Sequence, residues 1–208
     1  MSIAPPRVRR LPVIAPRQGQ LELEAMKGSD FMALVAQQAR SEESGSISSQ
    51  YEQELLSNDA MVGALALKAC NSTMGAISYG LVPLPRERGK FSLRIDVVVT
   101  RRHCRRLGIG TLLSAAVLSQ QLGVLGENLY HASVMAVHPA MIQVFSKLGF
   151  ERAAPNVPLY SRVVQNDHLE TLHRQTERVI QLRMRDLRTL CVDCRRSQAH
   201  QPWCVAEA

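Results

Sequence analysis

The sequence has few aromatic residues and lacks long apolar runs. Phe, Trp and Tyr together make up 4% of its 208 residues. Modules that bind single-stranded nucleic acid stack the bases on aromatic side chains that alternate with basic residues. This sequence lacks such a pattern. No apolar run reaches the roughly 18 to 20 residues that span a bilayer. We therefore expect no membrane span.

The sequence also lacks a dense, even-numbered set of cysteines. Five cysteines, an odd number, do not suit the paired framework of a small secreted protein. Residues 1–20 contain Arg and Pro but no apolar signal-peptide core. The expected location is the cytoplasm.

Positive charge is in excess. The 25 Lys and Arg residues outnumber the 18 Asp and Glu residues, which gives a formal net charge of +7. The basic residues concentrate in ranges 7–17, 101–106 and 174–196. Such patches attract anions but say nothing about the fold. A basic nucleic-acid-binding module is one alternative function, although no helix-turn-helix motif supports it.

The apolar periodicity predicts a single α/β (α+β) domain. Strand-like runs precede a β-α-β-α-β order, which is typical of a mixed sheet flanked by helices. Asp30 is the expected N-cap of the first helix. The predicted strands are 62–68, 74–82, 91–100, 129–137 and 159–164, and the predicted helices include 31–39, 111–121 and 140–148.

The composition divides the chain into four parts. Residues 1–20 form a basic, Pro-rich arm, and residues 21–165 form the main domain. Residues 166–190 predict an amphipathic helix that packs on the domain or on a second subunit. Residues 191–208 form a Cys-containing tail. A homodimer is therefore one expectation, through the helix or the last strand.

A glycine-containing turn is the most informative local feature. Arg105-Arg106-Leu107-Gly108-Ile109-Gly110 follows an apolar strand and opens a helix. The free N–H groups and the dipole of a helix start favour a bound anion, and glycine lets the backbone approach it closely. The turn predicts a phosphate site. The alternative is an ordinary turn with a solvated basic face.

The turn resembles the Arg/Gln-x-x-Gly-x-Gly/Ala motif of the GNAT superfamily of acyl-CoA N-acyltransferases. The segment from His138 to Phe150 resembles the family's later segment, where Asn begins a helix ending in Tyr-x-Lys-x-Gly-Phe. The resemblance covers roughly residues 60–164. It implies a mostly antiparallel sheet with a splayed central strand pair. It also implies transfer of an acetyl or short acyl group from acyl-CoA to a primary amine of a small molecule or protein.

The resemblance also implies where acetyl-CoA, the co-substrate, would lie. The backbone of the fourth strand would hold the pantetheine arm, and the turn amides would hold the pyrophosphate. By position, these residues are Val98, Val99, Thr100, Arg105, Arg106, Leu107, Gly108, Ile109, Gly110 and Thr111.

The catalytic residues depart from the family pattern. Phe145 stands where the family often has a proton-donating Tyr, and His138 stands where it often has Asn. His138 and Tyr130 are candidate proton donors, with Tyr79 and Tyr160 as further substitutes.

Asp96 lies within the fourth strand and is a candidate proton relay. In strict alternation it would share one face with Arg94 and Val98, and it could instead pair with Arg94 or Lys68. Because Phe145 has no proton to give, a second function is a GNAT-like protein that binds CoA or a partner with little or no catalysis.

The tail contains Cys191-x-x-Cys194-x5-His200-x3-Cys204. Four such ligands suit a tetrahedral zinc ion, so Cys191, Cys194, His200 and Cys204 form a candidate zinc knuckle. The alternative is a frayed tail with incidental free thiols.

Overall fold

Seven strands form one mixed sheet in the order β1-β2-β3-β4-β5-β7-β6. The computed structural model describes residues 21–41, 63–69, 72–85, 87–136, 139–164 and 168–197. All strand pairs are antiparallel except β4 and β5, which run parallel. The strands are β1 (Leu21–Met26), β2 (Gly63–Ala69), β3 (Ser72–Pro83), β4 (Phe91–Thr100), β5 (Leu129–Met135), β6 (Glu151–Ala154) and β7 (Val157–Val163).

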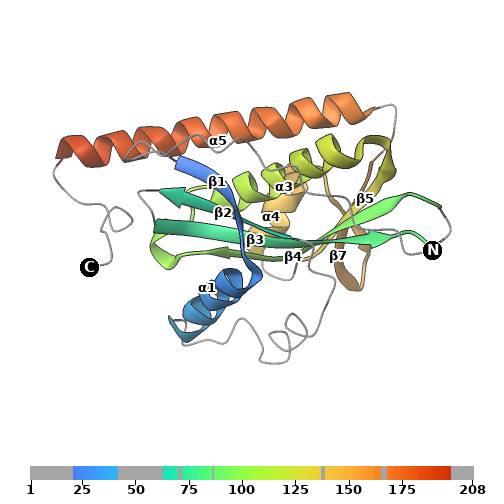
Figure 1. Cartoon of the computed structure of the whole chain (residues 1–208), viewed down its shortest axis with the longest axis horizontal. Helices are drawn as coiled ribbons and strands as arrows, with labels where there is room; N and C mark the ends of the chain where they lie inside the picture. Colours follow the sequence, from blue (N-terminus) through green and yellow to red (C-terminus); the bar gives the residue numbers. More distant parts are fainter. Residues whose placement is uncertain are drawn as a thin grey trace.

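Helices cover both faces of the sheet (Figure 1). The longer helices are α1 (Gly28–Ser41), α3 (Ile109–Leu125), α4 (Pro139–Lys147) and α5 (Leu169–Ser197), and short 3₁₀ turns lie at Arg102–Cys104 and Gly126–Asn128. Helix α1 packs on one face around Phe31 and Val35. Helices α3, α4 and α5 contribute to the larger core on the other face. This architecture confirms the predicted α/β class with a mixed, mostly antiparallel sheet.

Helix α3 is apolar on every side and is the central helix of the larger core. A helix of this kind must be covered all round, since any exposed face would place apolar area in water. The sheet covers one side and α5 packs along another. Leu172 and Leu187 of α5 are buried in the same core.

We expected no segment to be long and apolar enough to cross a bilayer, and one helix contradicts this expectation in length and composition. Residues Ile109–Asn128 are long and apolar enough to cross a bilayer. However, 72% of this window is buried inside the protein, as in the core helix of a soluble domain. The predicted cytoplasmic location stays a prediction.

Several element boundaries differ from the sequence prediction. Strands β1 and β6 are additional, and the predicted arm at 1–20 lies outside the described residues. Helix α1 begins at Gly28, so Asp30 lies in its first turn and is not the N-cap. In the described sheet, β7 lies between β5 and β6, and the last strand therefore has no free edge for pairing with a second subunit.

Phe145 belongs to the core. Its side chain is fully buried, and its ring meets Phe150 edge to face at a centroid distance of 5.2 Å. The amide of Phe150 donates to the carbonyl of Phe145, which closes the end of α4. The aromatic ring at this position thus holds α4 to the sheet.

We predict that Phe145→Tyr destabilises the protein. The added hydroxyl would enter a fully buried apolar site, and a buried hydroxyl without a partner costs about 1–3 kcal/mol. Phe91→Tyr is the matched control, because Phe91 is only half-buried at the start of β4 and its hydroxyl can reach water. Denaturant unfolding measures the free energy of unfolding of both variants. Equal values for Phe145→Tyr and Phe91→Tyr would contradict the prediction.

Candidate functional site

Strands β4 and β5 separate halfway along β4. Their parallel pairing runs from Phe91 with Leu129 to Ile95 with Val134. Beyond Ile95, β4 continues to Thr100 while paired only with β3 within the described sheet. The edge of β4 that faces β5 therefore carries backbone groups without a strand partner from residue 97 onward. Such an edge can pair with an extended ligand.

A β-bulge lies where the two strands separate. The register on β3 passes from Tyr79 with Ile95 to Ser78 with Val97, so Asp96 is the extra residue of β4. Ile95 packs in the larger core, whereas Val97 packs in the smaller cluster under α1. A bulge re-aims the side chains that follow it.

Because of the bulge, the side chains of β4 do not alternate between the two faces of the sheet as the sequence predicted. Strict alternation would put Val98 on the same face as Arg94 and Asp96. Instead, Val98 packs against the larger core, on the face of Ile95. Val99 packs with Val97 in the cluster under α1. One inserted residue therefore reverses which face each later side chain occupies.

Asp96 pairs with Arg94. The Arg94 Nε atom donates to Asp96 Oδ1 at 2.5 Å, and the Asp96 side chain is 8% exposed. Burial raises the pKa of Asp96 above its ordinary value, although the hydrogen bond and charge of Arg94 act in the opposite direction. The other predicted partner, Lys68, pairs with Glu24 instead. The structure therefore places a poorly solvated carboxyl at the start of the split.

The turn before α3 has the backbone of an anion site. Arg106 and Gly108 adopt left-handed φ angles of 66° and 78°, and Gly108 is the N-cap of α3. The amide of Leu112 donates to the carbonyl of Gly108 at 3.0 Å. The amides of residues 109–111 precede this first helical bond, so they are the ones that a bound anion can accept from.

Charge around the turn is positive. Arg105 and Arg106 are exposed, and the first turn of α3 contains no acidic residue. Cys104 is fully buried and anchors the preceding 3₁₀ turn. Burial raises the pKa of its thiol to about 11, an effect that the charge of Arg101 partly offsets. The thiol therefore stays protonated at neutral pH and serves packing.

The end of β4 and the turn meet at the split. Val98 Cγ1 lies 3.7 Å from where a Cβ on Gly110 would stand, and Val144 Cγ2 of α4 lies 3.9 Å from it. The predicted acyl-CoA contacts on β4 and on the turn are thus neighbours in space. Gly110 lies between a strand residue and an α4 residue, and the missing side chain keeps this junction open.

Two of the three catalytic candidates lie within the described residues. Asp96 is at the split. Tyr130 is the extra residue of a bulge at the amino end of β5 and is 39% exposed. The split opens at the carboxyl ends of the parallel strands, so Tyr130 lies at the opposite end of the β4–β5 pair. His138 lies outside the described residues.

The structure also shows a polar pair that the sequence did not suggest. His131 of β5 is the register partner of Ser92 on β4, and Ser92 Oγ lies 3.1 Å from His131 Nδ1. Burial lowers the pKa of His131, which favours the neutral imidazole at pH 7. The contact joins strands far apart in the chain, so only the strand register could have revealed it.

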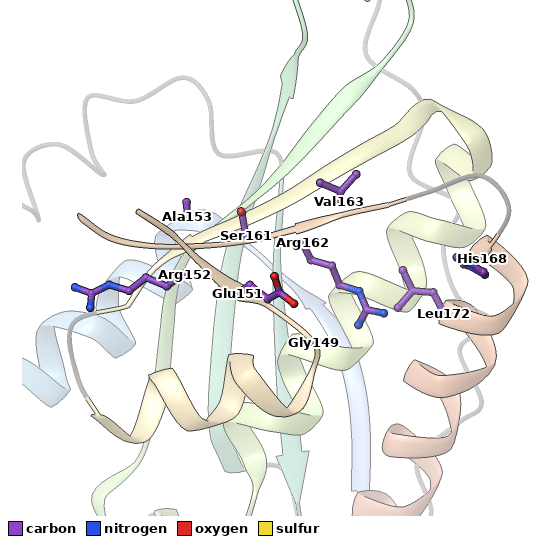
Figure 2. A pocket seen from close by; sticks show the side chains of 9 residues that line it. All are labelled: Gly149, Glu151, Arg152, Ala153, Ser161, Arg162, Val163, His168 and Leu172. Atoms are coloured by element: carbon purple, nitrogen blue, oxygen red, sulfur yellow. The ribbon is translucent and has the colours of Figure 1, made fainter. Parts of the chain in front are cut away.

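A separate hollow of about 460 Å³ lies between β6, β7 and the start of α5 (Figure 2). Figure 2 shows Arg162 and Glu151 on its wall. Arg162 donates to the carbonyl of Leu148 and so holds the end of α4. Of the described residues, none of the predicted acyl-CoA contacts and neither Asp96 nor Tyr130 lines this hollow.

The zinc prediction gains no support. Helix α5 continues to Ser197, so Cys191 and Cys194 lie in a helix and not in a tail. His200 and Cys204 lie outside the described residues. Within the described part of the chain, no three His, Cys, Asp or Glu side chains form a group that could hold a metal.

No family model and no curated protein sequence matches this chain. Solved structures do match. Arabidopsis thaliana NAA60 in complex with a bisubstrate analogue has a TM-score of 0.53 and 11% identity, over 71% of this chain and 99% of its own. The Escherichia coli GNAT family N-acetyltransferase YhbS in complex with CoA has a TM-score of 0.53 and 15% identity, over 76% and 88%.

A third structure is a GNAT family acetyltransferase from Brucella melitensis in complex with acetyl-CoA. It has a TM-score of 0.51 and 13% identity, and the match covers 71% of this chain and 90% of the other. At such low identities the likeness concerns the fold alone. The split sheet, the turn before α3 and these neighbours agree on one conclusion. The chain has the fold of the GNAT acyl-CoA N-acyltransferases.

Proposed function

We propose that this protein transfers an acetyl or other short acyl group from acyl-CoA to a primary amine. One observation carries the proposal: the β4–β5 split opens next to the electropositive turn that begins α3. An extended arm with a pyrophosphate at one end fits this combination. Three solved structures of the same fold are named as complexes with a bisubstrate analogue, CoA or acetyl-CoA.

The residues at the split have separate tasks in binding. The amides at residues 109–111 and the Arg105–Arg106 pair would hold the pyrophosphate. The β5-facing edge of β4 at residues 97–100 would pair with the amides of the pantetheine arm. This arrangement leaves the thioester near the bulge at Asp96. An N–H of the same edge is a suitable donor to the thioester oxygen as negative charge develops there.

Asp96 is the proposed base. Acyl transfer requires a neutral amine, and a carboxylate accepts the amine proton directly or through water. Its raised pKa brings Asp96 closer to the range in which a base works at neutral pH. Arg94 fixes the orientation of the carboxylate through the bond to Oδ1.

Tyr160 is the proposed proton donor for the leaving thiolate. It is the register partner of Val134, the residue of β5 at which pairing with β4 ends. Tyr79 also adjoins the bulge, but its hydroxyl lies 2.7 Å from where a Cβ on Gly63 of β2 would stand and thus points away from β5. His138 stays a second candidate. If neither group donates, the protein binds CoA without turnover.

The proposal is tested first by ligand-induced stabilisation and turnover. Acetyl-CoA should raise the melting temperature, because a ligand of the native state must stabilise it. A panel of primary amines with a thiol-release assay then measures transfer. Stabilisation without CoA release on any amine would favour the binding-only alternative, and no stabilisation would contradict the proposal.

We predict that Gly108→Ala weakens binding of acetyl-CoA. An alanine at a φ of 78° is strained by about 1–2 kcal/mol, which distorts the turn that holds the phosphates. Gly89→Ala is a matched control, because Gly89 has a φ of 79° and no heavy atom within 4 Å of a Cβ placed on it. Calorimetry should show loss of affinity only in Gly108→Ala. Equal affinity in both variants would count against the turn as the phosphate site.

We predict that Asp96→Asn lowers the turnover number by about 100-fold, a typical loss for a removed general base. Binding of acetyl-CoA should persist. Asp30→Asn, the same change on the exposed first turn of α1, should have little effect on turnover. Equal turnover in wild type and Asp96→Asn would exclude Asp96 as the base.

Because the pKa of Asp96 is raised, the stability of Asp96→Asn can show that its lost turnover does not come from unfolding. Its raised native pKa means that the ionised carboxylate costs stability above the unfolded pKa of about 3.8. Removing the charge should therefore leave the melting temperature at pH 7 equal to or above that of the wild type.

We predict that Tyr160→Phe lowers turnover by at least tenfold, since phenylalanine has no proton to give to the leaving thiolate. Binding of CoA should change little. A loss confined to Tyr130→Phe or His138→Ala would instead assign the donor to that residue.

A further inference from the structure

Helix α5 reaches the turn that begins α3. The two helices pack along each other in opposite directions: His173, near the start of α5, lies 3.4 Å from Ser119 in the second half of α3. Ten residues later, Arg183 lies at the amino end of α3, against Gly108. Figure 1 shows α5 running across the molecule above α3.

The Arg183 side chain lies directly on the glycine. A Cβ placed on Gly108 would stand 3.2 Å from both Cδ and Nε of Arg183 and 3.4 Å from Cζ. The guanidinium therefore lies over Gly108, the N-cap residue of α3. Glycine at this position serves two purposes: it permits the left-handed φ, and it lets the arginine approach the backbone.

Within the described part of the chain, one ion pair engages the Arg183 guanidinium, which leaves N–H donors for a further partner. This ion pair joins Nη1 to Asp186 Oδ2 at 3.6 Å, on the next turn of the same helix. Asp186 also lies 3.9 Å from Arg185 Nη2, so one carboxylate is shared between two arginines. A guanidinium has five N–H donors in a planar fork that matches phosphate oxygens. The Arg183 side chain is 38% exposed, so an anion can reach it.

We propose that Arg183 of α5 binds the pyrophosphate of acyl-CoA, and that α5 is thus part of the co-substrate site. The inference rests on the proposed function, because it takes the turn before α3 as the pyrophosphate site. The turn supplies backbone N–H groups to the phosphates, and Arg183 supplies a formal charge on the α5 side of the turn. Arg105 and Arg106 supply charge from the first residues of the same turn.

A purely structural role makes a different prediction. If Arg183 only fastens α5 to α3, its loss lowers stability and affects all ligands of the split alike. If it binds pyrophosphate, its loss weakens only ligands that contain pyrophosphate. The chemistry of the ligand therefore separates the two roles.

The test uses the full chain and three probes: CoA, 3′-dephospho-CoA and pantetheine. Arg183→Gln should weaken CoA and 3′-dephospho-CoA alike, by about tenfold, as expected for one lost charged hydrogen bond. Pantetheine, which has no phosphate, should bind Arg183→Gln and wild type equally. Arg183→Lys should lie between the two, because it keeps the charge but loses the fork.

Arg174→Gln is the matched control. Arg174 also lies on α5 and also pairs with an acidic residue, Glu170, at 2.5 Å. It is 75% exposed and lies near the start of the helix. This variant loses the same charge and one ion pair, and it should bind CoA as the wild type does. Calorimetry measures every affinity, and thermal unfolding measures the stability of each variant.

Each contrary result has a clear meaning. Equal CoA affinity in Arg183→Gln and Arg174→Gln overturns the role of Arg183 while leaving the proposed function intact. If Arg183→Gln loses affinity for CoA but not for 3′-dephospho-CoA, Arg183 contacts the 3′-phosphate. This result overturns the assignment to pyrophosphate. A similar loss for pantetheine shows a structural role. Absence of CoA binding by the wild type overturns the proposed function and this inference together.

Discussion

The separation of β4 from β5 after Ile95 is the constraint on which the rest of the site depends. Two parallel strands that stayed paired would satisfy each other's backbone groups along their whole length. Here, β4 continues past the last pair, Ile95 with Val134, and remains paired only with β3 in the described sheet. The bulge at Asp96 lies at this point. Because of this bulge, the apolar side chains of β4 pack on the larger core before residue 96. After residue 96 they pack both on the larger core and on the cluster under α1.

The covering of α3 is the second determinant. This helix is apolar on all sides, so one sheet face is not enough to shield it from water. Helix α5 supplies the missing cover with a stripe that includes Leu172, Ile180 and Leu187. Because it runs antiparallel to α3, α5 also brings Arg183 to Gly108 at the first turn. The same packing that stabilises the core thus determines which charge lies beside the turn that begins α3.

Sequence reasoning found the parts of the site whose signal is local. A glycine turn between an apolar strand and a helix predicts a backbone that can approach an anion closely, and the structure adds that Gly108 has a left-handed φ. The substitution of Phe145 for Tyr was readable too. The structure added that this ring packs against Phe150 in the core. The sequence did not predict which face of β4 carries the side chains that follow the inserted residue. Strict alternation put Val98 on the wrong face, because a bulge has no sequence signature of its own.

The sequence by itself determined the α/β class, the order of the main elements and the positive charge and glycines of the turn before α3. These follow from periodicity, glycine and charge, which act over a few neighbouring residues. Only the tertiary structure decided that Asp96 pairs with Arg94, that Tyr160 adjoins Val134 at the split, and that Arg183 covers Gly108. The last two contacts join residues far apart in the chain, and strand register and helix packing bring them together. The Asp96–Arg94 pair is close in sequence, but the bulge determines where that carboxyl lies.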